Sequence, residues 1–175
     1  SRERLEKVRD DLASSQSLCA GVSREQVRSR SYWLYKAALA GDSQSALNFG
    51  TGSFIHDDML GQLEQIPFWR DHAEEMLQRA LAGGEVHALQ ALANAHDPME
   101  PYAMPKLAPD PVAAYAYYTV MSLLPGAQND LAEYALARLD PQMTDADRDD
   151  ALARAADICL NELPTICNLP ASGAP

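Results

Sequence analysis

The sequence predicts an all-α fold built from stacked helix pairs. The chain has 175 residues, of which 47% are hydrophobic and 22% are charged, so it is globular and long enough to bury a core. No segment shows the alternation of a strand, whereas apolar residues recur at helical spacing. A helix–glycine–helix pattern in residues 32–50 returns in residues 76–93. A repeat with a period of about 40 residues indicates helical hairpins that must stack to bury their apolar faces.

The first 22 residues predict an amphipathic helix. Leu5, Val8 and Leu12 fall at helical spacing among charged residues. Such a helix has to bury its apolar stripe against another part of the protein.

The first helix pair is marked by its caps. Ser23 with Gln26 three residues later is typical of a capping box, and the helix it opens runs to Ala40. Gly41 stands where a helix-ending glycine belongs. A shorter helix follows over residues 43–50.

The second pair begins with a proline. Pro67 suits the first turn of a helix that runs to Gly83 and Gly84. A second helix follows over about residues 86–95. The proline-rich residues 96–111 then predict a loop.

Two further helices are expected over residues 112–124 and 129–139. Thr144 with Asp147 predicts a capping box that opens a last long helix ending near Asn161. The chain therefore divides into an N-terminal helix, two to three helical repeats, and a C-terminal capping helix with its tail, over residues 1–22, 23–140 and 141–175.

The repeat aligns residue by residue at an offset of 43. The aligned pairs are Trp33 with Met76, Lys36 with Arg79, Ala37 with Ala80, Gly41 with Gly84 and Phe49 with Leu92. A third copy would place Tyr117 at the position of Trp33, although Pro125 then replaces the glycine. We expect Trp33 and Tyr117 to be buried at equivalent places, and the glycine and alanine positions to be structural.

The first copy resembles the Sel-one-like repeat, a relative of the tetratricopeptide repeat. The stretch WLYKAALAGDSQSALNFG carries the resemblance, which extends over roughly residues 24–140. The matching positions are Trp33, Lys36, Ala37, Ala38, Gly41, Asp42 and Gly50. The resemblance implies a right-handed superhelical α/α solenoid that binds proteins or peptides.

Two helix faces are candidate partner-binding surfaces. The first combines aromatic and cationic side chains, with the alternative that the N-terminal helix covers it. The second is the polar face of the helix that starts near Pro67; in tetratricopeptide-like arrays the equivalent face lines the concave groove. The candidate residues are Arg28, Tyr32, Tyr35 and Lys36 on the first face, and Asp71, His72, Glu75 and Gln78 on the second.

Catalysis is not expected. The sequence has no S-x-x-K, G-x-S-x-G, H-E-x-x-H or phosphate-binding loop. The alternative is a hydrolase or metal-dependent enzyme around His72 and Glu75, which are spaced as some metal ligands are, with His56, Asp57 or Asp58 as further ligands. A solvated polar face is the commoner meaning of that spacing, so we expect neither a metal nor a cofactor.

Charge is unevenly distributed along the chain, whose net charge is −11. Residues 1–36 hold eight basic and five acidic side chains, whereas the remainder holds six basic and twenty acidic ones. An acidic body repels phosphate backbones and favours a cationic protein partner. We therefore predict a non-catalytic interaction module, either an adaptor or an inhibitor of the immunity-protein type.

The pairing of the three cysteines indicates the cellular compartment in which the protein is expected. A helix stop at Asn161 followed by a chain reversal can bring Cys159 and Cys167 within bridging distance. Cysteine-rich members of the resembled family bridge cysteines at this spacing. The alternatives are a bridge from Cys19 to either cysteine, or three free thiols. A bridge predicts a periplasmic or secreted bacterial protein that has lost an N-terminal signal or anchor, with a cytoplasmic protein as the alternative. No apolar run is long enough to span a membrane.

Overall fold

The computed structural model describes residues 6–7, 21, 23, 29–55, 60–124, 128–164 and 167. Two compact units divide the chain, Ser1–Arg30 and Ser31–Pro175. In the first unit Glu6 and Lys7 are helical. The predicted apolar stripe of the N-terminal helix, the first capping box beyond Ser23, Cys19 and Arg28 lie outside the described residues.

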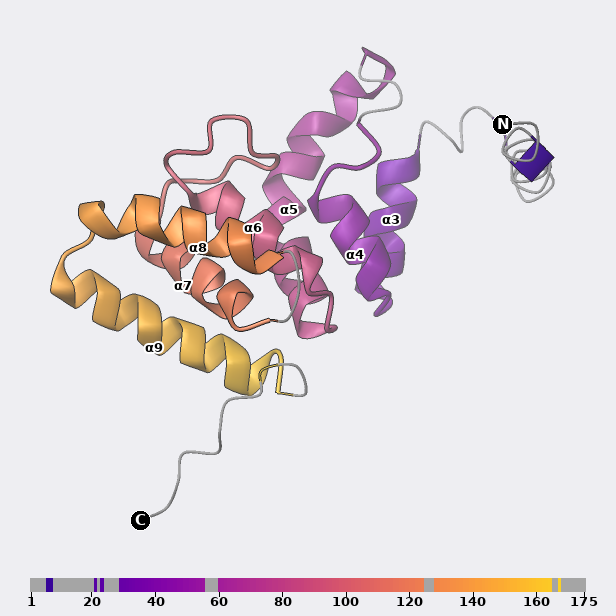
Figure 1. Ribbon diagram of the computed structural model, residues 1–175. Coiled ribbons are helices and arrows are strands. Elements are labelled where there is room, and N and C mark those ends of the chain that lie inside the picture. The colour runs from indigo at the N-terminus through magenta and orange to yellow at the C-terminus, as the bar shows by residue number, and fades with distance from the viewer. Residues whose placement is uncertain are drawn as a thin grey trace. The chain divides into compact units, whose positions relative to one another are not determined.

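Every regular element among the described residues of the second unit is a helix, which confirms the all-α prediction (Figure 1). The elements are α3 (Arg30–Leu39), α4 (Ser43–Gly50), the 3-10 helix η1 (Leu60–Gln65), α5 (Ile66–Ala82), α6 (His87–His96), α7 (Pro111–Ser122), α8 (Gln128–Leu139), the 3-10 helix η2 (Asp140–Gln142) and α9 (Asp145–Asn161).

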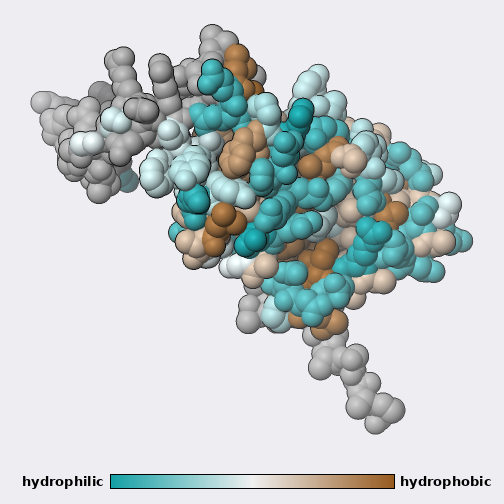
Figure 2. All heavy atoms as spheres, turned by 180° about the vertical axis from the view of Figure 1, so that it is seen from behind, coloured by the Kyte–Doolittle hydropathy of each residue, from teal (hydrophilic) through white to brown (hydrophobic). Residues whose placement is uncertain are grey.

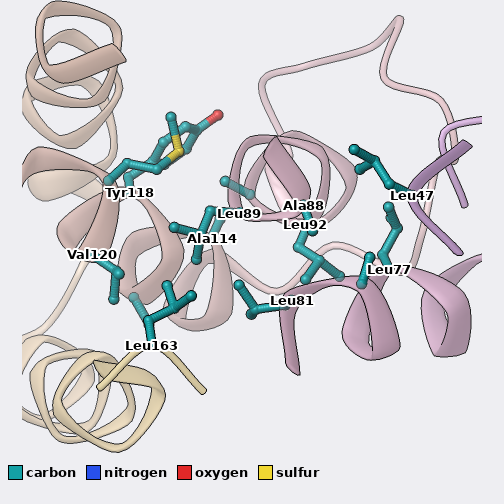
Figure 3. Packing of buried hydrophobic residues seen from close by; sticks show 14 of the residues in the cluster. Leu47, Leu77, Leu81, Ala88, Leu89, Leu92, Ala114, Tyr118, Val120 and Leu163 are labelled. Carbon is teal, nitrogen blue, oxygen red and sulfur yellow. The ribbon is translucent and has the colours of Figure 1, made fainter. Parts of the chain in front are cut away.

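From α4 to α8, successive helices pack against one another. α4 lies against α5, α5 against α6, and α6 against α7. α7 is central to the C-terminal half, because α8 and α9 also pack on it (Figure 1). Buried side chains form one cluster that extends from Leu47 in α4 through Leu89 and Val120 to Leu163 after α9 (Figure 3).

Local sequence signals explain where these helices begin. Pro67 stands in the first turn of α5, and Asp110 caps α7 by accepting the Ala113 amide at 2.9 Å. The predicted capping box of α9 is confirmed, since Thr144 and Asp147 each bond to the other's backbone amide.

The helix-to-helix turn repeats bond for bond at the predicted offset. Gly41 and Gly84 have φ values of +101° and +88°, which lie in the left-handed region that favours glycine. The amide after each glycine donates to a carbonyl in the last turn of the preceding helix, from Asp42 to Ala37 at 3.0 Å and from Glu85 to Ala80 at 2.9 Å. The repeated sequence therefore encodes a repeated backbone geometry.

The two equivalent turns also contact each other. Ser43 Oγ donates to Glu85 Oε1 at 2.9 Å. A Cβ atom added to Gly83 would lie 2.5 Å from the Ser43 Cβ, so only glycine allows this approach. The consecutive hairpins are thus packed turn against turn at this end.

The prediction that Trp33 is buried is wrong. Trp33 is 56% exposed, whereas Met76 is fully buried. α3 buries the stripe of Ser31 and Ala38, and Trp33 lies about 200° around the helix from Ser31. Met76 is covered because α5 follows α4, which packs on it, whereas α3 is the first helix of its unit. Tyr117 is partly buried against the core.

A buried ion pair fixes the long loop between α6 and α7. Asp97 is fully buried and pairs with Arg138 of α8, whose guanidinium also donates to Glu100 at 3.1 Å. Tyr118 of α7 donates to Asp97 Oδ2 at 3.3 Å, and the Lys106 ammonium donates to the Asp97 carbonyl at 2.7 Å. The network joins α7, α8 and the loop at the end of α6.

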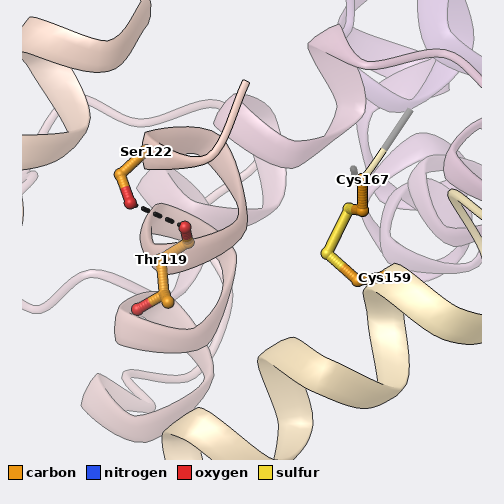
Figure 4. Close-up of a disulfide and its surroundings, with 4 residues drawn as sticks. All are labelled: Thr119, Ser122, Cys159 and Cys167. Atoms are coloured by element: carbon orange, nitrogen blue, oxygen red, sulfur yellow. Dashed lines mark hydrogen bonds between the residues drawn. A yellow bond between two sulfur atoms is a disulfide. The ribbon is translucent and has the colours of Figure 1, made fainter. Parts of the chain in front are cut away.

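The predicted bridge between Cys159 and Cys167 is present (Figure 4). The two Cα atoms are 5.5 Å apart, within the range a disulfide requires. The chain reverses after α9 around the buried Leu163, whose carbonyl accepts the Cys167 amide at 3.0 Å. The bridge therefore fastens the segment after α9 back onto the end of that helix.

The two tryptophans should differ sharply in their contribution to stability. Trp69 is 5% exposed and donates from Nε1 to the Phe49 carbonyl at 2.7 Å. We expect Trp69→Ala to lower the free energy of unfolding by about 3–5 kcal/mol, through the lost contacts and the cavity left behind. Trp33→Ala is the matched control and should cost about 1 kcal/mol or less. Urea denaturation followed by circular dichroism measures both; equal losses would contradict the packing described.

Candidate functional site

A groove of about 390 Å³ runs between α7 and α9. Three of its seven lining residues are alanines, so the two helices leave an open, partly apolar groove between them. The lining residues are Ala113, Ala116 and Tyr117 from α7, and Ala153, Arg154, Asp157 and Ile158 from α9.

Tyr117, which lines the groove, stacks on His96. The Tyr117 and His96 rings lie 6.3 Å apart with an angle of 14° between their planes. His96 Nε2 is 3.5 Å from a Glu74 carboxylate oxygen, and its Nδ1 is 3.3 Å from the Ala108 carbonyl oxygen. The imidazole therefore lies between Glu74 of α5 and the α6–α7 loop, against the tyrosine ring.

The charge of Arg154 is already balanced. Its guanidinium lies 3.5 Å from Asp110 and 3.0 Å from Asp150. Asp110 is at the same time the N-cap of α7. Asp157 accepts a hydrogen bond at 2.6 Å from the side-chain amide of Asn161, which is a neutral donor.

The pKa of Tyr117 lies above the ordinary value of a tyrosine. Burial is the main cause that raises the pKa of Tyr117, and the negative charge of Glu74 is the next. Arg154 opposes this shift, while Asp110 and Glu162 add to it. The groove thus combines an apolar floor with one lining carboxylate, Asp157, and one lining guanidinium, Arg154, which is itself paired with two further carboxylates.

The residues of the first predicted surface do not share one exposed face in the structure. Tyr32 and Lys36 are exposed on α3, with the Lys36 ammonium 5.6 Å from the centre of the Tyr32 ring. Tyr35 instead points into an aromatic cluster, 5.4 Å from the Phe49 ring and 5.1 Å from the Phe68 ring. Arg28 lies outside the described residues.

The second predicted surface meets the first at His72. The His72 ring is 5.0 Å from the Tyr35 ring and 4.6 Å from the Phe68 ring, and its Nδ1 lies 2.9 Å from the Phe68 carbonyl oxygen. The rest of the set faces solvent on α5: Asp71 and Gln78 are exposed, and Glu75 pairs with Arg79 at 3.0 Å. His72 therefore serves the packing of α3 on α5.

The described part of the chain holds no group of three or more His, Cys, Asp or Glu side chains placed to bind a metal. The additional ligands considered for His72 and Glu75 lie at residues 56–58, outside that part. Likewise, no helix in that part of the chain combines the length and hydrophobicity of a membrane span.

Sequence reasoning did not single out the groove between α7 and α9. Its lining comes from two helices that are distant in sequence, and no local sequence pattern indicates that they are neighbours in the fold. The available signal was the clustering of alanine in residues 113–116 and 151–156, which marks helices that approach closely.

Comparison of the chain with protein-family models, with curated proteins and with solved structures finds no match.

The raised pKa of Tyr117 predicts a stability loss in alkali. In the unfolded chain tyrosine ionises near pH 10, before it does so in the folded protein. The stabilisation that the neutral phenol provides is complete below about pH 10 and is lost as pH rises toward the folded pKa. Tyr117→Phe should therefore show a smaller drop in unfolding free energy than the unmodified protein between about pH 8 and 10.5. An equal drop in both proteins, measured by urea denaturation, would contradict the assignment.

Proposed function

We propose that this chain is a non-catalytic interaction module, an α/α solenoid of Sel-one-like helix pairs with an acidic surface that binds a cationic protein. The observation that carries the proposal is the pairing of its cations. Every basic side chain after Lys36 already forms an ion pair or donates to a backbone carbonyl. These six are Arg70, Arg79, Lys106, Arg138, Arg148 and Arg154.

The same segment contains twenty acidic side chains, so most of its negative charge has no internal cation to balance it. Such an excess creates a potential that attracts a cationic protein and repels anions. Figure 2 shows that hydrophilic side chains cover much of one face and that the hydrophobic patches on it are small and separate.

The repeated turn at Gly41 and Gly84 supports the solenoid part of the proposal. Identical turns stacked one on the next produce an extended surface rather than a closed pocket, as repeat proteins use for binding. In this arrangement α9 and its bridge cap the end of a right-handed superhelical stack.

Adaptor and inhibitor roles both fit an acidic module. An immunity-type inhibitor gains most from electrostatic attraction, because attraction speeds the encounter with a cationic toxin or hydrolase. The bridge between Cys159 and Cys167 favours an oxidising compartment, which supports a periplasmic or secreted protein as part of this proposal.

The test is to isolate the bound partner from the native source and to measure its binding kinetics. We expect a protein with a cationic contact surface whose association rate falls between about 50 and 300 mM salt, because salt screens steering beyond about 10 Å. The dissociation rate should change less. An acidic partner, or an association rate that is independent of salt, would contradict the proposal.

A further inference from the structure

The groove between α7 and α9 has the shape and charge of a binding pocket for a short peptide. We propose that it receives a segment of the cationic partner that places one small apolar side chain beside a lysine or arginine. This inference rests on the proposed function and names the site through which it would act.

The apolar part of the recognition follows from the floor of the groove. Ala113 and Ala116 on one side face Ala153 and Ile158 on the other, so the floor offers contacts but no hydrogen bonds from side chains. A volume of about 390 Å³ is at the lower end of binding pockets, which suits one or two residues of a peptide. A small aliphatic side chain would remove this floor from water.

The cationic part follows from the rim. Asp157 and Arg154 are the charged residues that line the groove. Arg154 does not cancel Asp157, because Asp110 and Asp150 already pair with its guanidinium, so three carboxylates stand against one guanidinium here. An incoming ammonium or guanidinium therefore meets an excess of carboxylates next to the apolar floor.

Tyr117 adds a polar anchor between floor and rim. Its hydroxyl is protonated at neutral pH, as that of any tyrosine is, and burial raises its pKa further. No described residue forms a hydrogen bond with this hydroxyl, so it is able to bond to the backbone of a peptide. A free metal or polyamine cation would use the rim alone, whereas a peptide uses the rim, the floor and this hydroxyl together.

The probe is the blocked tripeptide acetyl-Lys-Val-Lys-amide, added to the ¹⁵N-labelled protein and followed by NMR. Chemical-shift changes should centre on Tyr117, Ala153 and Asp157, with a dissociation constant on the order of 1 mM. Acetyl-Lys-Gly-Lys-amide, which lacks the apolar side chain, and acetyl-Glu-Val-Glu-amide, which reverses the charge, should each bind at least tenfold more weakly.

Two matched pairs of variants on α9 separate the groove from general acidity. Ala153→Trp fills the groove, while Ala156→Trp places the same side chain at an exposed position that does not line it. Asp157→Lys reverses a charge on the groove, while Asp149→Lys makes the same change in net charge at an exposed position outside it. We expect at least tenfold weaker peptide binding for the first member of each pair and less than a twofold change for the second.

Several outcomes would overturn the assignment of the groove. Shift changes spread over the acidic surface, equal losses in both members of a pair, or no shift changes at 20-fold excess over the expected ~1 mM constant would each do so. A dimer of the free protein that Ala153→Trp dissociates would assign the groove to a second copy and would also overturn it.

The same four variants separate this inference from the proposed function. If the isolated cationic partner binds all four alike, the groove assignment fails while the interaction module stands. If no cationic partner exists but the tripeptide binds as described, the groove is a peptide site and the proposed function fails.

Discussion

The buried ion pair between Asp97 and Arg138 is the interaction on which the C-terminal half of the protein depends. It stands at the end of α6, where the chain leaves the helix and begins the loop that leads to α7. That loop is tied back to α6 by two backbone bonds, from Leu107 to Ala95 at 3.1 Å and from Asp110 to His96 at 3.0 Å. The loop in turn supplies the Ala108 carbonyl near His96 and the Asp110 carboxylate near Arg154. The geometry of the groove therefore depends on the buried Asp97–Arg138 pair, which lies outside the groove.

Such a pair specifies a structure more than it stabilises one. Removing two charges from water offsets much of their attraction, yet removing only one partner leaves the other buried and unpaired. Asp97 is further held by Tyr118 and by the amide of Met99, while the Lys106 ammonium bonds to its carbonyl. A loop with these fixed bonds has one arrangement, which a purely apolar contact would not enforce.

Much of the fold was predictable because the signals are local. Capping residues, the helix-ending glycines at 41 and 84, and the spacing of Cys159 and Cys167 all act within a few residues of the chain. The failures involve tertiary neighbours. Trp33 has the sequence position of a buried residue, but no preceding helix in its unit covers it. The residues that contact Asp97 and Tyr117 come from helices that no local sequence pattern identifies as neighbours.

Hydrogen exchange of the Leu107 and Asp110 amides in an Asp97→Asn variant tests most directly whether this ion pair holds the loop. The variant preserves the shape of the side chain but removes the charge that Arg138 requires. We predict that both amides exchange at least tenfold faster, a change of about 1.4 kcal/mol in local opening, while the Glu85 amide in the other turn keeps its protection. Unchanged protection of Leu107 and Asp110 in a folded Asp97→Asn protein would show that the loop, and the groove beside it, are positioned by something else.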